Sequence, residues 1–165
     1  MSRVEEKLSA MGLALPDVNV PRGAFLPFRR DGQLVFMAGQ ICEWNGGVPH
    51  VGPVLDNGQT APDGLATVDL ATGRTAAQVC ALNLLFHLRT ATDGDLDRVE
   101  TVVRLGGFVQ CLPGFASSPA VINGASDLLI DLYGEAGRHA RTAVGVAGLP
   151  ANASVEVDAI FRLRD

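Results

Sequence analysis

The pattern of apolar residues predicts an α+β domain, in which one mixed sheet of six strands carries two helices on one face. Three observations support this fold class. The chain has 165 residues, the length of one ordinary domain. Two segments repeat apolar residues at helical spacing, and the other apolar runs are short, rich in β-branched residues and bounded by turn residues. No repeat or linker divides the sequence, so we expect residues 1–165 to form a single domain.

The N-terminal segment predicts a short leading helix and a β-hairpin. In the helix, residues 2–11, Ser2 stands at the N-cap and Glu5 at the matching position of a capping box. An Asp-Gly dipeptide, typical of a tight hairpin turn, follows at Asp31-Gly32. It joins the two apolar runs that are expected to form the hairpin strands, residues 23–30 and 33–38.

A third strand is expected over residues 48–54, after the turn at Asn45-Gly46. Pro49 and Pro53 place it at an edge of the sheet, because proline has no amide hydrogen to donate to a neighbouring strand. Residues 55–67 are rich in turn formers and are expected to form a loop.

The remaining sequence predicts two long helices and three strands. The first helix, residues 71–91, has a wide apolar face at helical spacing, and the second, residues 119–133, ends at Gly134. The strands are expected over residues 96–110, 140–147 and 154–163. Helices on one face leave the other face of the sheet uncovered, so we expect the chain to form a homo-oligomer.

Composition disfavours several kinds of partner. Thirteen basic and eighteen acidic residues give a net charge of −5, no basic stripe is present, and aromatic residues make up 5% of the chain. Nucleic acid is therefore not an expected partner. No apolar run approaches the roughly 18 residues of a membrane span, and the N-terminus lacks the apolar core of a secretory signal. We therefore expect no membrane association and a cytoplasmic location.

The three cysteines fit a reducing compartment and no metal-binding motif. They are odd in number and widely spaced, which argues against a disulfide framework. Buried packing is the simplest interpretation, and Cys42 alone follows a segment that we interpret as functional. The three residues are Cys42, Cys80 and Cys111.

No motif predicts a metal or a cofactor. Asp93, Asp95 and Asp97 imitate the start of a calcium loop, but Arg98 and Arg104 occupy its glycine and glutamate positions. A phosphate loop, a dinucleotide-binding fingerprint and a nucleophile elbow are all absent from the sequence. The histidines lack metal-ligand spacing to one another or to a cysteine; they are His50, His87 and His139.

Two charged residues interrupt the last two apolar strands. Arg141 and Glu156 stand where core residues would be expected, and a half-buried guanidinium is costly unless an anion meets it. They form either an internal salt bridge or parts of a ligand site. In a simple hairpin Arg141 would face a residue near 160, which leaves Glu156 roughly 13 Å away. The strands are then not neighbours, or the side chains converge through a ligand or water.

The sequence around Arg141 and Glu156 resembles that of the YjgF family, also called the Rid (reactive intermediate deaminase) or "endoribonuclease L-PSP" family. The resemblance extends from Gly23 to Leu163 and is most specific from Arg141 to Glu156, with Ala38-Gly39-Gln40 and Asn123 as supporting matches. It implies a chorismate-mutase-like fold and a trimer with clefts between subunits. The leading helix and residues 55–67 make this chain similar to a longer subgroup of the family.

The resemblance also implies an activity, the hydrolysis of reactive enamines and imines such as 2-aminoacrylate to 2-keto acids and ammonia. Arg141 would grip the substrate carboxylate in a bidentate pair, and Glu156 would position or activate water. Gly39 and Ala143 would offer backbone groups, and Asn123 would reach the cleft from a neighbouring subunit. An imine carbon is already electrophilic, so this chemistry needs no metal or cofactor.

Two departures from the family pattern keep other functions open. Phe25 and Ala38 stand where deaminase members usually carry a tyrosine and a serine or threonine, so two hydroxyl groups are missing. One alternative is a regulatory trimer that binds a small carboxylate or 2-keto acid without turnover. A further alternative is the ribonuclease activity in the family's label, against which the acidic net charge argues.

Overall fold

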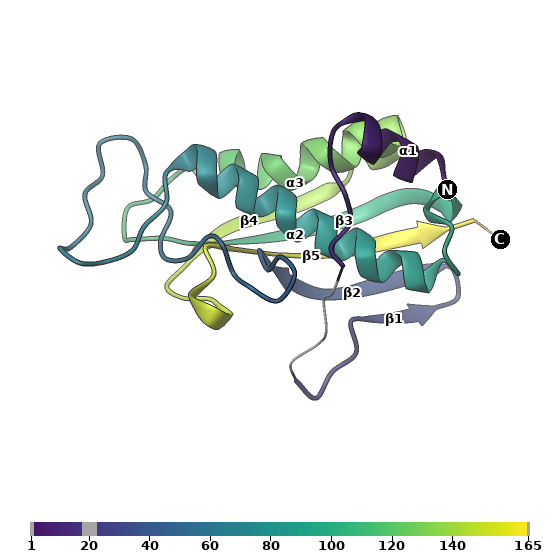
Figure 1. Ribbon diagram of the computed structural model, residues 1–165, viewed down its shortest axis with the longest axis horizontal. Coiled ribbons are helices and arrows are strands. Elements are labelled where there is room, and N and C mark those ends of the chain that lie inside the picture. The colour runs from purple at the N-terminus through teal and green to yellow at the C-terminus, as the bar shows by residue number, and fades with distance from the viewer. Residues whose placement is uncertain (1, 18–22, 165) are drawn as a thin grey trace.

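The computed structural model describes residues 2–17 and 23–164. Its elements confirm an α+β architecture with a five-stranded mixed sheet and three α-helices (Figure 1). The helices are α1 (Arg3–Ala10), α2 (Leu70–Ala91) and α3 (Ser118–Tyr133). The strands are β1 (Phe28–Asp31), β2 (Leu34–Ile41), β3 (Val99–Gln110), β4 (Ala140–Val146) and β5 (Val155–Leu163).

The strands lie in the order β1-β2-β5-β3-β4. Only β3 and β4 pair in parallel, and the other neighbours are antiparallel. Strand β3 therefore separates β4 from β5, although these two follow one another in the sequence. The connection from β3 to β4 passes through α3, as a parallel pair requires.

The sixth strand that the sequence predicts, over residues 48–54, is not a strand of the sheet. Only isolated bridges form there, from Val51 to Ala153 and from Val54 to Val68 and Cys111. Pro49 and Pro53 interrupt the run of donors that a continuous ladder needs, so the segment crosses the end of the sheet. The predicted strand 96–110 likewise begins later, because residues 96–98 form a turn of 3-10 helix before β3.

The leading helix has the predicted cap. Ser2 Oγ accepts a hydrogen bond from the Glu5 amide at 3.2 Å, and the Glu5 carboxylate accepts one from the Ser2 amide at 2.9 Å. The Lys7 ammonium donates to the Leu132 carbonyl at 2.6 Å, so α1 is fastened to the end of α3. None of the helices in the described residues is long and apolar enough to cross a bilayer.

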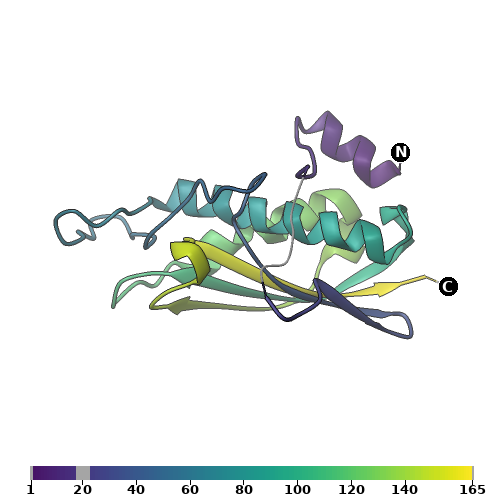
Figure 2. The ribbon, with the colours of Figure 1, turned by 60° about the horizontal axis from the view of Figure 1, so that its bottom comes forward.

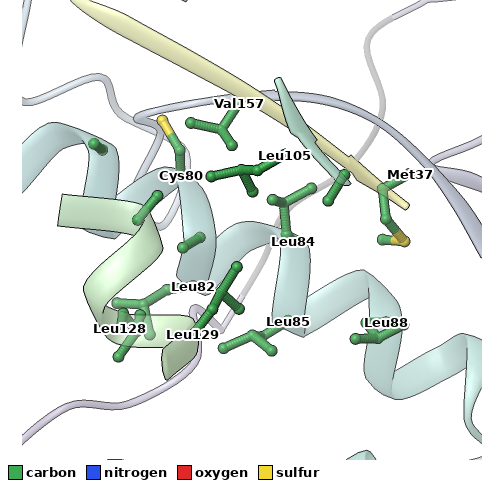
Figure 3. Packing of buried hydrophobic residues seen from close by; sticks show 14 of the residues in the cluster. Met37, Cys80, Leu82, Leu84, Leu85, Leu88, Leu105, Leu128, Leu129 and Val157 are labelled. Carbon is green, nitrogen blue, oxygen red and sulfur yellow. The ribbon is translucent and has the colours of Figure 1, made fainter. Parts of the chain in front are cut away.

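The core lies between the sheet and the two long helices, which run side by side on one face of the sheet (Figure 2). Figure 3 shows Leu84 of α2 pointing toward the strands, beside Leu105 of β3. Gly107 of β3 admits the close approach of α3, because a side chain there would overlap Ile122. On the opposite face, which we call the open face, Phe36 and Val144 are each about two-fifths exposed.

Candidate functional site

Arg141 lies on the edge strand β4, on the side that faces α3. Its Nη1 donates to Asn123 Oδ1 at 2.7 Å and to Ser126 Oγ at 3.0 Å. Its Nη2 donates to the Pro119 carbonyl at 3.3 Å. We call Arg141, Asn123, Ser126 and Pro119 the Arg141 group. The same face of β4 continues through Ala143, which pairs with Gly107.

The charge of Arg141 has no negative partner within this part of the molecule. All three acceptors are neutral, and no ion pair joins Arg141 to a carboxylate among residues 2–17 and 23–164. The guanidinium is exposed at the edge of the sheet. A fixed, exposed guanidinium with neutral supports is suited to a planar anion such as a carboxylate.

Glu156 lies on β5 and points to the open face, where it is half-buried. Burial raises the pKa of its carboxyl group, and the negative charge of Asp158 adds to that rise. Asp158 is in turn paired with Arg104, whose Nη1 lies 2.9 Å from its Oδ1. A carboxylate with a raised pKa is a better proton acceptor than an ordinary one.

Gly39 makes room for the Glu156 carboxylate. A Cβ atom at position 39 would overlap Glu156 Oε1 and would lie 3.0 Å from Cδ. The register of β2 against β5 shifts between Met37 and Gln40, so Ala38 and Gly39 form an irregularity in the ladder. We call Gly39, Ala38 and Glu156 the Glu156 group.

The two groups lie on opposite faces of the sheet. Arg141 is in register with Leu105, and Leu105 with Ala159, both of which are buried on the helical face. Alternation along β5 then places Glu156 on the open face. Strands β4 and β5 are two strand spacings apart, about 10 Å. Glu156 lies three residues along β5 from Ala159, the residue level with Arg141, and this offset adds about 10 Å along the strands.

This geometry contradicts one expectation and decides another. The internal Arg141–Glu156 salt bridge that the sequence allowed does not form, because the side chains point away from each other. The other possibility, that the strands are not neighbours, is confirmed, since β3 lies between β4 and β5. Within one chain, Arg141 and Glu156 do not meet at a common ligand.

The other predicted site residues lie in one of the two groups or next to one of them. The amide oxygen of Asn123 accepts a hydrogen bond from Arg141 of its own chain. The expected contact of Asn123 with a cleft of a neighbouring subunit stays a prediction. Phe25 is exposed and precedes Pro27, whose carbonyl accepts the Ala38 amide at 2.9 Å. Phe25 therefore lies in the segment fastened to the Glu156 group.

Ser126 is a member of the Arg141 group that the sequence analysis missed. Residues three apart on a helix share a face, so its spacing from Asn123 is the signal that could have identified it. The position is informative only once α3 is known to pack against β4.

The cysteines and histidines form no metal site in the part of the chain that the structure describes. All three cysteines are free thiols, and Cys42 and Cys80 are buried. A hydrogen bond with the Cys80 side chain lowers the pKa of Cys42 to about 7. Cys42 belongs to neither group as defined above.

Comparison with known proteins gives one consistent result. The model of a family described as "YjgF/chorismate mutase-like, putative endoribonuclease" matches residues 5–162. A curated relative, Protein TCP17 of Trypanosoma cruzi, is 38% identical over 164 residues, covering 99% of this chain and 96% of that protein.

Solved structures agree. A protein of unknown function from Agrobacterium tumefaciens has a TM-score of 0.84 and 37% identity, covering 98% of this chain and 93% of its own. The structure of a protein from Shewanella oneidensis, described as "a putative endoribonuclease", has a TM-score of 0.84 and 29% identity, covering 97% of this chain and 99% of its own. Escherichia coli TdcF with bound serine shares the fold, with a TM-score of 0.53, 20% identity, and coverage of 92% of this chain and 94% of its own.

Proposed function

This chain belongs to the YjgF/chorismate mutase-like family, and we propose that it hydrolyses reactive enamines and imines of the 2-aminoacrylate type to 2-keto acids and ammonia. The observation that carries the proposal is the Arg141 group, an exposed guanidinium held by three neutral acceptors and facing no carboxylate of the described residues. Serine, which TdcF binds, carries an α-carboxylate of the kind that such a guanidinium recognises.

The chemistry divides between the two groups. The imine carboxylate binds Arg141, and water held by Glu156 attacks the imine carbon. As the C–O bond forms, Glu156 accepts a proton from the water, and the C=N electron pair moves to nitrogen. Glu156 returns that proton to nitrogen, which gives the carbinolamine. The carbinolamine hydroxyl proton then passes through Glu156 to the amino group, the C=O bond forms as the C–N bond breaks, and ammonia leaves the 2-keto acid. The raised pKa of Glu156 suits both proton transfers, and no metal or cofactor enters the balance.

The proposal requires a second copy of the chain. Because the Arg141 group and the Glu156 group lie on opposite faces of one sheet, one substrate contacts both only when they come from different copies. The exposed apolar residues of the open face, Phe36 and Val144, are available for such an assembly. We propose a homotrimer with one cleft at each subunit boundary.

Complementation between two inactive variants tests the proposal directly. Arg141→Ala and Glu156→Gln each remove one group and should each abolish hydrolysis of an imine generated in situ by an amino-acid oxidase. When the variants are unfolded and refolded together in equal amounts, about a quarter of the clefts combine an intact Arg141 with an intact Glu156. We expect about a quarter of wild-type activity to return. Recovery of none, by mixtures shown to be mixed trimers, would contradict clefts shared between copies.

A second function is favoured by Phe25 and Ala38, which lack the hydroxyl groups usual in deaminase members. It is binding of a 2-keto acid as a regulatory signal, without turnover. Titration with 2-ketobutyrate separates the two functions. Saturable binding that Arg141→Ala removes, with no acceleration of hydrolysis over several imines, would support the regulatory role.

A further inference from the structure

A chain of hydrogen bonds lies behind Arg141 and ends at His139. The Ser126 hydroxyl that accepts from Arg141 lies 3.0 Å from His139 Nε2. The other ring nitrogen, Nδ1, lies 2.7 Å from the Gly137 carbonyl oxygen. His139 and Arg141 are two residues apart, yet they communicate through Ser126 of a different element, α3.

The direction of each hydrogen bond follows from the chemistry of its ends. A carbonyl oxygen only accepts, so His139 Nδ1 carries the proton that it donates to Gly137. Burial and the charge of Arg141 lower the pKa of His139, so the ring is neutral at pH 7 and Nε2 is an acceptor. Ser126 therefore donates its hydroxyl proton to Nε2 and turns its lone pairs toward Arg141.

This arrangement determines which donors of Arg141 remain for a ligand. Both Nη1 protons are used, one by Asn123 and one by Ser126, and Pro119 takes one Nη2 proton. Nε–H and the second Nη2 proton make no hydrogen bond to the described residues. In a guanidinium, Nε–H and the inner Nη2 proton lie on one side, and this side binds a carboxylate in two parallel hydrogen bonds.

We propose that His139 is a positioning residue, which acts through Ser126 to hold the Nε–H and Nη2 edge of Arg141 toward a substrate carboxylate. This inference rests on the proposed function, since it concerns the same anion site. It adds a selectivity: a carboxylate fills both donors, whereas the matching amide offers only one acceptor oxygen.

Three variants test the inference: His139→Phe, Ser126→Ala and the double variant. His139→Phe keeps a ring but has no acceptor, and Ser126→Ala removes the link. Each single variant should weaken 2-ketobutyrate binding about 3- to 10-fold, the effect of one hydrogen bond, and raise KM while leaving kcat nearly unchanged. Binding of 2-ketobutyramide should change much less.

The double variant distinguishes positioning from general structural support. If His139 acts through Ser126, adding His139→Phe to Ser126→Ala should cost no further affinity. Independent and additive losses, or equal losses for 2-ketobutyrate and its amide, would overturn the inference. Thermal denaturation of each variant identifies any that fails to fold, in which case the other single variant decides.

A measurement without ligand separates this inference from the proposed function. Absence of 2-ketobutyrate binding by the wild-type protein would contradict the proposed function alone. The hydrogen-bond chain is then read by ¹⁵N NMR, in which His139 should show the Nδ1–H form and Arg141 Nε–H should exchange slowly with water. Both single variants should speed that exchange, and unchanged exchange would overturn the positioning role.

Discussion

Replacing Gly39 by alanine should move the Glu156 carboxylate without unfolding the protein. The added Cβ would overlap Glu156 Oε1, and it would lie 3.0 Å from Cδ and 3.3 Å from Cγ. Comfortable packing between carbon atoms begins near 3.5 Å. The Cδ atom must therefore retreat by about 0.5 Å, and the oxygen by about 1 Å or more. Since the atoms in the way belong to the end of a flexible side chain, rotation of the carboxylate relieves the overlap.

Activity should respond far more than stability. A displacement of about 1 Å at a catalytic group costs on the order of 100-fold in rate. We expect Gly39→Ala to lower kcat for imine hydrolysis by about that factor. Binding of 2-ketobutyrate should change less, because the Arg141 group lies on the other face of the sheet. The assay is ammonia release from an imine formed in situ, with binding followed by calorimetry.

Gly106→Ala is the matched control. It adds a methyl group on the same open face, but its Cβ would lie 2.9 Å from Cγ of Asp158 rather than against Glu156. We expect it to retain much more activity than Gly39→Ala. Wild-type kcat in Gly39→Ala, or equal losses in the two variants, would refute the role assigned to the Glu156 carboxylate.

Three further predictions concern charge and packing. The proposed hydrolysis requires ionised Glu156, so its rate should fall as pH falls through the raised pKa of this carboxyl group. Asp158→Asn should shift the acid limb of the pH–rate profile to lower pH, and Arg104→Gln should shift it to higher pH. The raised pKa of Glu156 means that the folded state favours the protonated carboxyl group. The contribution of Glu156 to stability is therefore lost as pH rises. Glu156→Gln should for this reason raise Tm more at pH 7 than at pH 4. An equal or smaller gain at pH 7 would contradict this. Leu85→Ala should cost about 2–5 kcal/mol in chemical denaturation, because the Leu85 side chain is fully buried. A cost below about 1 kcal/mol would show that the core closes around the gap.

Local patterns in the sequence were sufficient for most elements. The helical spacing in residues 71–91 and the capping box at Ser2 depend on neighbours within a few residues, and both are found as predicted. The prediction of a strand over residues 48–54 was wrong, and the reason is also local. Its β-branched residues favour a strand, but its two prolines lack the donors that a strand needs.

The site could not be predicted to the same extent, because it depends on strand order. The types of Arg141 and Glu156 marked them as unusual within apolar strands, and that signal is local. Their separation arises because β3 lies between β4 and β5, a parallel crossover that no spacing in the sequence reveals. Ser126 became visible only when α3 was seen to pack against β4.

The uncompensated charges of the two groups support a shared cleft better than a site within one chain. If Arg141 and Glu156 served only the fold, pairing each with an opposite charge would lower the energy of the single chain. Instead Arg141 has neutral acceptors, and Glu156 lies beside another carboxylate, Asp158. In the proposed assembly, the positive group on one face of one copy would meet the negative group on the other face of the next, with the substrate between them. The features that are unfavourable for the isolated chain are thus those that an assembly and its ligand would satisfy.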